Sequence, residues 1–258
     1  GATGSGTFKS SDPYGSETTG TISQRYEVVI GQARIVESKT HSETRNVDGS
    51  SQTQEMTVSY QYNATGHLTH AAGTGTFSSD DGFGNKTTGA ITQSFLIIWG
   101  QAKIGTSKTI SDTVNLDGST QHQEMTVTYT YDYIGKVRTS QAVGSFISDE
   151  FGSGKLTGAS GEGTFEPNDG YNNITRGTIS QKYEIVNGQA KLTSSKTLSK
   201  TTNLDGSTQE QEMVVDYRYD AAGNLATYGG VVNTWNYRNR LTDTNNSGTS
   251  THYLYDFN

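Results

Sequence analysis

Residues 31–62 read GQARIVESKTHSETRNVDGSSQTQEMTVSYQY. Asp48-Gly49 lies near the middle of this segment, between two runs that are rich in strand-forming residues. An Asp-Gly pair in such a setting is typical of a tight hairpin, since both positions tolerate a left-handed backbone. Beyond the turn, polar side chains alternate with apolar or aromatic ones, which share one strand face; these are Met56, Val58, Tyr60 and Tyr62. The segment predicts a long antiparallel hairpin with one apolar-aromatic face and one polar face.

The same segment occurs three times. Its opening Gly-Gln-Ala phrase begins at Gly31, Gly100 and Gly188, so the copies are offset by 69 and then by 88 residues. Constant offsets across separate markers indicate duplicated structural units, which suit scaffolds, shells and fibres better than an enzyme with one asymmetric site. The first hairpin turn of each unit is expected at Gly31, Gly100 and Gly188, and the second at Asp48-Gly49, Asp117-Gly118 and Asp205-Gly206.

A further pair of strands precedes each of these hairpins. In the first unit Gly6-Thr7-Phe8 opens the pattern, and after a turn Ile22, Tyr26 and Val28 recur in phase. Alternation with a period of two is typical of a half-buried strand, and no segment shows helix periodicity of useful length. We therefore expect an all-β fold with no significant helix, in which repeated antiparallel meander and hairpin units form an elongated or curling sheet.

The repeat also divides the chain into segments. The longer second offset is explained by one inserted hairpin, because Gly144–Gly158 looks like a truncated copy of Gly163–Gly177. After Gly230 a shorter pattern begins. The expected organisation is a β repeat unit at 1–73, a second at 74–143, the inserted partial repeat at 144–162, a third unit at 163–230 and short repeats at 231–258.

Composition narrows the classes of protein. Only 30% of the residues are hydrophobic and 17% are charged, and the chain has no Cys. Disulfides and thiolate ligands are therefore excluded. The net charge of −7 disfavours a nucleic-acid partner, because phosphate binding depends on clustered Lys and Arg. No apolar run approaches the length of a membrane-spanning helix, so we expect no membrane span.

Each return strand ends in a related phrase, which reads YRYDAAGNL at 217–225, YTYDYIGKV at 129–137 and YQYNATGHL at 60–68. An Asp in such a phrase can accept bonds from turn amides and the Gly permits the reversal; the residues concerned are Asp132, Gly135, Asp220 and Gly223. The phrase resembles the Tyr-Asp repeat of the Rhs/YD-repeat proteins. Residues 235–242 (WNYRNRLT) and 253–256 (YLYD) resemble two further repeats.

This resemblance implies a long β-sheet strip that spirals into a shell, in a secreted or surface-exposed protein. In that family the shell often encloses a C-terminal toxin or presents a surface for adhesion. The chain departs from the family because its long hairpins replace the short family unit, and because it has neither the self-cleaving region with paired Asp residues nor a toxin domain.

Acidic turns and strand charges are the main candidates for chemistry. The turns could offer oxygen ligands to Ca²⁺, but none has the full ligand spacing, so we favour plain β-turns and expect no cofactor; they are Asp80-Asp81-Gly82, Asp149-Glu150 and Asn168-Asp169-Gly170. The repeated Glu55, Glu124 and Glu212 could pair with strand lysines. If Asp48-Gly49 is a two-residue turn, however, Lys39 lies opposite Val58 and Glu55 opposite Ser42, so no direct pair is expected.

The residue pattern leads to a structural role. Nothing resembles a catalytic triad, dyad or phosphate loop, so we expect a non-enzymatic extracellular or cell-surface scaffold. Unpaired sheet edges are templates for strand addition, which predicts a homo-oligomer or polymer in the form of a filament, sheath or shell. The expected assembly edges lie at Gly6, Thr7 and Phe8 and at Tyr253 and Tyr255. The alternatives are an adhesion or carbohydrate-binding module, with Tyr strips that stack on a glycan or other surface ligand, and a shell fragment of a polymorphic toxin.

Overall fold

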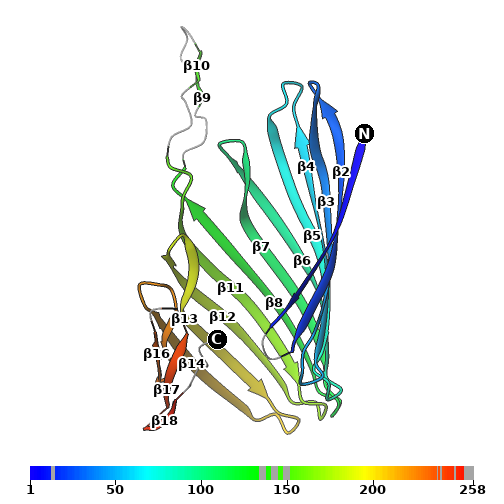
Figure 1. Ribbon diagram of the computed structural model, residues 1–258. Helices are drawn as coiled ribbons and strands as arrows, with labels where there is room; N and C mark the ends of the chain where they lie inside the picture. Colours follow the sequence, from blue (N-terminus) through cyan, green and yellow to red (C-terminus); the bar gives the residue numbers. More distant parts are fainter. Residues whose placement is uncertain are drawn as a thin grey trace.

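The computed structural model describes residues 1–12, 15–133, 138–140, 145–147, 152–236, 238, 240–246 and 248–252. Within these ranges the chain contains strands and no helix. Sixteen strands form one antiparallel sheet in linear order that does not close on itself (Figure 1). Two short strands, β9 (Arg138–Ser140) and β10 (Ser145–Ile147), pair only with each other. The predicted all-β class of repeated hairpin meanders is confirmed.

Three four-strand units follow one another along the sheet, and four shorter strands complete it. The first unit comprises β1 (Ala2–Ser11), β2 (Glu17–Val29), β3 (Gln32–Arg45) and β4 (Ser51–Tyr62). The second comprises β5 (Leu68–Asp80), β6 (Lys86–Ile98), β7 (Gln101–Val114) and β8 (Thr120–Tyr131). The third comprises β11 (Leu156–Asn168), β12 (Ile174–Val186), β13 (Gln189–Thr202) and β14 (Thr208–Tyr219). The last strands are β15 (Leu225–Tyr228), β16 (Val231–Trp235), β17 (Leu241–Asn246) and β18 (Thr249–His252).

The added length between the second and third units lies in one connection. Residues 63–67 join β4 to β5, whereas residues 132–155 join β8 to β11, and both strand pairs have the same antiparallel arrangement. The added residues therefore lie within 132–155, which overlaps the 144–162 segment expected from the sequence over residues 144–155. The boundaries at 73 and 162 fall inside β5 and β11, because the Gly-Thr-Phe marker lies in the middle of a strand, whereas the structural units divide at turns.

The sheet has little core. Half-buried and exposed side chains alternate along β6 and β12, with Ile91, Phe95 and Ile97 on the half-buried face of β6. Among the described hydrophobic residues only Val36, Ala71, Ile98 and Val231 are buried. The chain exposes 16879 Å², whereas a compact monomer of this mass exposes roughly 11,000 Å². Strand pairing and an open, single-layer surface therefore dominate the fold.

The first hairpin turn of each unit consists of two residues with a left-handed backbone. In the first unit these are Ile30 (φ 51°) and Gly31 (φ 71°), between the paired residues Val29 and Gln32. Two central residues with positive φ define the type I′ turn, which matches the natural twist of a hairpin. The equivalent turns are Trp99-Gly100 and Asn187-Gly188.

The second hairpin turn differs from the predicted one. Arg45 pairs with Ser51, so the connection is longer than Asp48-Gly49, and Gly49 has a positive φ whereas Asp48 does not. The Asn46 amide donates to Ser50 O (2.9 Å) and the Gly49 amide donates to Asn46 O (3.1 Å). This is a three-residue loop with a glycine bulge. The expectation of a two-residue turn is wrong, and Lys39 consequently lies opposite Thr57, one position away from Val58.

A phenylalanine covers a strand glycine in every unit. Phe8 pairs with Gly20, Phe77 with Gly89, and the third unit repeats the arrangement. A Cβ atom on Gly89 would overlap both the Phe77 ring and Ile110 O. Aromatic cover of a glycine protects a position that has no side chain of its own, and it helps to set the strand register.

We expect Gly89→Ala to lower the free energy of unfolding by about 1–3 kcal/mol, because the new methyl group meets backbone and ring atoms that cannot both move away. Gly6→Ala is the matched control, since a Cβ there meets nothing within 4 Å and the backbone φ is ordinary. Urea unfolding followed by circular dichroism measures both variants. Equal midpoints for the two would contradict this role of the Phe-Gly pair.

Candidate functional site

The one-residue difference in register brings Lys and Glu together in every unit. The three ion pairs, with their N–O distances, are Lys39–Glu55 (3.2 Å), Lys108–Glu124 (2.7 Å) and Lys196–Glu212 (2.8 Å). The expectation that no direct pair forms is therefore wrong, because it depended on the shorter turn. These side chains are about half exposed, and water screens such pairs, so each pair contributes little to stability.

The Asp of each second hairpin turn accepts hydrogen bonds inside its own loop. Asp48 Oδ1 accepts from the Ser50 amide (2.9 Å) and the Ser50 hydroxyl (2.7 Å), and these bonds lower the pKa of Asp48. Asp117 and Asp205 accept equivalent bonds, and their pKa values are lowered for the same reason. The three carboxylates therefore stabilise the loops to which they belong.

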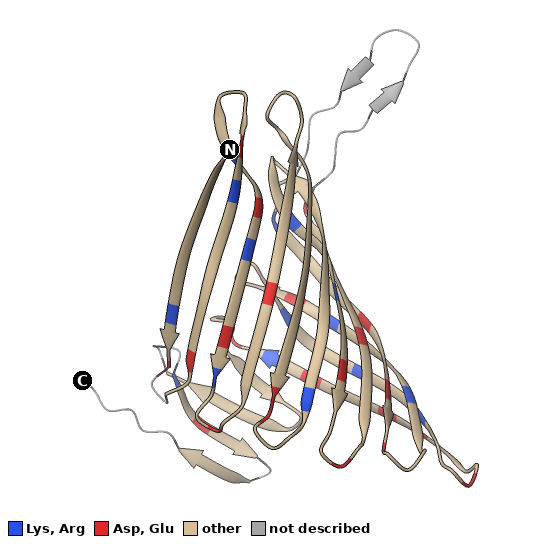
Figure 2. Ribbon diagram, turned by 90° about the vertical axis from the view of Figure 1, so that its right-hand side faces the viewer, with Lys and Arg blue, Asp and Glu red and all other residues tan. Residues whose placement is uncertain are grey.

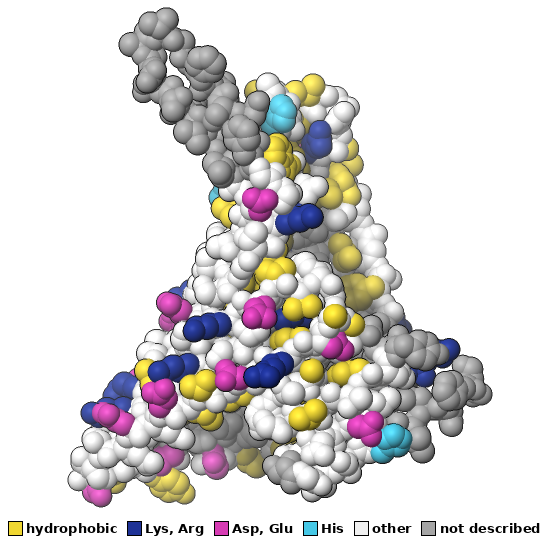
Figure 3. All heavy atoms as spheres, turned by 90° about the vertical axis from the view of Figure 1, so that its left-hand side faces the viewer, with side chains coloured by type: hydrophobic (Ala, Val, Ile, Leu, Met, Phe, Trp, Pro, Cys, Tyr) yellow, Lys and Arg dark blue, Asp and Glu magenta, His cyan; other side chains and the backbone are white. Residues whose placement is uncertain are grey.

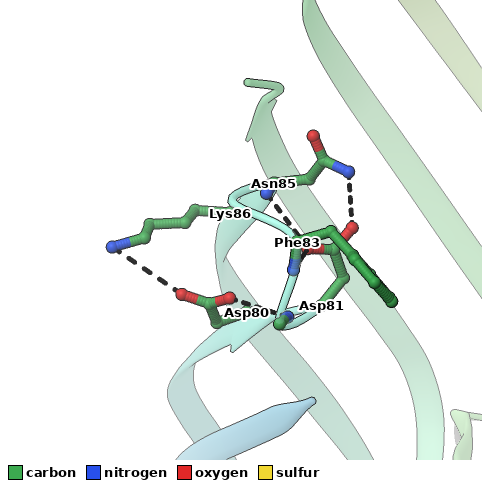
Figure 4. A network of polar contacts seen from close by, with 6 residues as sticks. Asp80, Asp81, Phe83, Asn85 and Lys86 are labelled. Carbon is green, nitrogen blue, oxygen red and sulfur yellow. Dashed lines mark hydrogen bonds and ion pairs between the residues drawn. The ribbon is translucent and has the colours of Figure 1, made fainter. Parts of the chain in front are cut away.

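The carboxylates of the acidic turns also accept hydrogen bonds from residues of the same turn. In the β5–β6 turn, Asp81 Oδ1 accepts from the amides of Phe83 (2.8 Å) and Asn85 (3.1 Å), and Asp80 Oδ1 accepts from the Gly82 amide (2.9 Å) (Figure 4). Asp80 also lies 3.7 Å from Lys86 Nζ. The equivalent carboxamide and carboxylate of Asn168 and Asp169 accept from Gly170 and Tyr171. No metal-binding group is found among the described residues, which do not include Asp149 and Glu150.

The Tyr-Asp phrase at 217–225 forms a turn with the expected Asp and Gly contacts. Asp220 Oδ1 accepts from the amides of Ala222 and Asn224, both at 2.9 Å, and Gly223 has φ 85°. Asp132 instead accepts from the Ser153 amide (2.9 Å) and hydroxyl, across the long connection. Gly135 lies outside the described residues. In both places the Asp that follows the return strand accepts hydrogen bonds from the residues that lead into the next strand of the sheet.

Acid should weaken the folded state through these turns. A carboxyl whose pKa is lowered by folding stabilises the fold above its ordinary pKa, and this contribution is lost as the pH falls through the lowered value. We expect the triple variant Asp48→Asn, Asp117→Asn, Asp205→Asn to be less stable than the parent near neutral pH, with a smaller difference at about pH 2. Urea midpoints at both pH values measure the change. A difference that does not depend on pH would contradict the assignment.

An open groove of about 850 Å³ crosses β8 and β11–β14. Its lining includes Leu198 and the ion pairs Arg176–Glu166 (2.8 Å) and Lys200–Glu210 (3.1 Å). On the face that Figure 3 draws, side chains of opposite charge lie next to one another, and Figure 2 shows both signs spread along the strands. The groove reaches Glu210 and Glu212 of β14, so it borders the outer limit of the third unit.

One edge of the sheet is the whole length of β1. Of the described strands only β2 pairs with it, from Ala2 to Ser11. The outer edge of β1 is therefore open. It carries the predicted edge residues Gly6, Thr7 and Phe8, all of which are exposed. Unpaired amide and carbonyl groups along such an edge can accept another strand.

A second open edge lies on β14. This strand pairs with β13 from Thr208 to Asp216, but with β15 only from Tyr217 to Tyr219. No other described strand pairs with the 208–216 part. In β4 and β8 the equivalent stretch is covered on both sides, by β3 and β5 and by β7 and β11.

Sequence reasoning missed the β14 edge. Tyr253 and Tyr255, the edge residues expected near the C-terminus, lie outside the described residues, and β18 is the last strand of the sheet. A signal was present, because the first two return strands are followed by Gly-Thr-Phe at Gly75 and Gly163, whereas no such phrase follows the third. Residues 220–258 therefore contain no segment of this kind that could pair with the third return strand.

No protein-family model matches this chain, and no curated protein matches it in sequence. Among the described residues there is no helix with the length and apolarity that a bilayer crossing requires.

Proposed function

We propose that this chain is a non-enzymatic structural repeat protein that assembles through strand addition at the open edges of its sheet. The observation that carries the proposal is the edge of β14 from Thr208 to Asp216, which is unpaired in the described chain although both equivalent strands are paired. An open edge of this length is a template for another strand, and proteins that remain monomeric usually block such edges with proline, a bulge or a covering segment.

The exposed area of the sheet supports the same function. A single layer with few buried hydrophobic residues leaves much of its surface in contact with water, and stacking or assembly is the usual means by which a repeat protein covers such surface. The proposed product is a filament, sheath or shell on the outside of a cell. The likeness of the return-strand turns to Tyr-Asp repeats supports an extracellular or surface location, because the proteins of that family are secreted or surface-exposed.

The environment of the tyrosines favours a structural role over glycan stacking. Tyr62 Oη donates to Ile35 O and Tyr131 Oη donates to Ile104 O, both at 2.9 Å, so these side chains bind neighbouring strands. Tyr60 is half-buried, and desolvation by burial raises its pKa. Rings that are held against the sheet in this way are poorly presented as flat platforms for a sugar.

Assembly is expected to increase with protein concentration. Size-exclusion chromatography with light scattering, followed by electron microscopy of the leading fractions, should show a series of oligomers that grow into elongated or curved particles. Dilution should shift the distribution back towards the monomer. A single compact monomer at every concentration tested would overturn the proposed function.

A further inference from the structure

We propose that the open edge of β14 in one copy pairs antiparallel with the open edge of β1 in a second copy, with Met213 opposite Gly6. This inference rests on the proposed function and specifies its partner, its two edges and its register. It makes each junction between copies a repeat of the junctions that already exist inside one chain.

The internal junctions supply the template. Between the first and second units Met56 pairs with Gly75 and Glu55 with Thr76. Between the second and third units Met125 pairs with Gly163 and Glu124 with Thr164. The equivalent residues at the two open edges are Met213 and Glu212 on β14, and Gly6 and Thr7 on β1. The same register therefore places Glu212 opposite Thr7 and Gln211 opposite Phe8.

Gly6 is the clearest sign of a missing strand. A Cβ on Gly75 would overlap Glu55 O, and a Cβ on Gly163 would overlap Glu124 O, so glycine at this position allows the preceding unit to approach closely. A Cβ on Gly6 meets nothing within 4 Å. Gly4 behaves differently, since Tyr26 of β2 lies 3.4 Å from its Cβ position and already fills that space. The space beside Gly6 is thus the one that a strand of the β4 type occupies.

Met213 lacks the glycine contact that the equivalent methionines make with the next unit. Met56 Sδ lies 3.2 Å from the Cβ position of Gly75, and Met125 Cε lies 3.1 Å from that of Gly163, and both side chains are half-buried. Met213 is 50% exposed, and its neighbour Val214 is equally exposed. Pairing with a β1 strand would cover both residues as β5 and β11 cover their equivalents.

Charge fits the same register. The proposed register places Glu210 opposite Lys9. Within its own chain Glu210 already binds Lys200 (3.1 Å), and Lys9 already binds Glu17 (2.7 Å). Lys and Glu would alternate across the junction. The internal β8–β11 junction has a comparable row at the same position, in which Arg176, Glu166, His122 and Asp112 follow one another across four strands. A shift by one residue would place every pair on opposite faces.

The strand order places the two edges on opposite sides of the three-unit part of the sheet, so each is expected to meet a different copy. β1 begins the sheet and β14 ends its three-unit part, with the remaining long strands between them, and the sheet does not close (Figure 1). An edge that fits the opposite edge of an identical molecule gives a head-to-tail contact, which continues as a ring or an open filament.

The test uses single cysteines, since the natural chain has none. Thr7→Cys and Glu212→Cys proteins are purified separately, mixed in equal amounts under the conditions that favour assembly, and oxidised mildly. We expect a covalent dimer on a non-reducing gel, at a yield at least ten-fold above that of either protein alone. Thr7→Cys mixed with Gln211→Cys is the register control, because those side chains lie on opposite faces in the proposed pairing.

A double variant that carries both cysteines tests whether the edge of β14 pairs with β1 of the same chain instead of with a second copy. Disulfide-linked ladders support a second copy, whereas a cross-link confined to the monomer band would overturn the proposal in favour of closure within one chain. Particles of the parent protein without the 7–212 dimer would overturn this pairing alone and leave the proposed function standing. A parent protein that stays monomeric at every concentration would overturn both.

Gly6→Ala provides a readout without cysteine. Its methyl group is accommodated in the monomer but would meet the carbonyl of the docking strand, so the concentration needed for half-assembly should rise at least ten-fold while the urea midpoint stays unchanged. Gly4→Ala is the matched control, and we expect it to assemble as the parent does. Equal assembly by both variants would overturn the proposed pairing.

Discussion

Main-chain pairing between neighbouring strands holds this molecule together, because almost no core lies behind the sheet. A conventional sandwich or barrel distributes its stability between ladders and a packed interior, whereas here the interior is reduced to a few side chains such as Ala71 and Ile98. Register therefore matters more than usual. Each hairpin loop determines which side chains become neighbours, and a one-residue difference in a loop changes which residues pair on both faces.

The Asn46–Ser50 loop is the device that sets this register. Its side chains bond to one another, with Asn46 Nδ2 donating to Ser50 Oγ (2.9 Å) and Asp48 accepting from Ser50. The same loop recurs at 115–119 and 203–207. Three identical loops give three identical ladders, and from them follow the Lys–Glu pairs, the glycine contacts and the equivalence of the unit junctions.

Much of the fold could be predicted from residue patterns. An open series of antiparallel hairpins could be predicted from the period-two alternation, the repeated sequence markers and turns such as Ile30-Gly31. The length of the second loop was not predictable from Asp48-Gly49, because the same dipeptide serves both a two-residue turn and the last positions of a bulged loop. The β14 edge needed a different argument, since a strand reveals its lack of a partner only when the following segment is seen to pair elsewhere.

The connection between β8 and β11 has a consequence of another kind. The connection at 132–155 is much longer than the connection at 63–67. The pairing of β8 with β11 nevertheless matches that of β4 with β5. The length of the connection and the geometry of the strand pairing are thus independent of each other at this point of the chain. In an array built from identical junctions, such a connection would recur once per subunit at a fixed spacing.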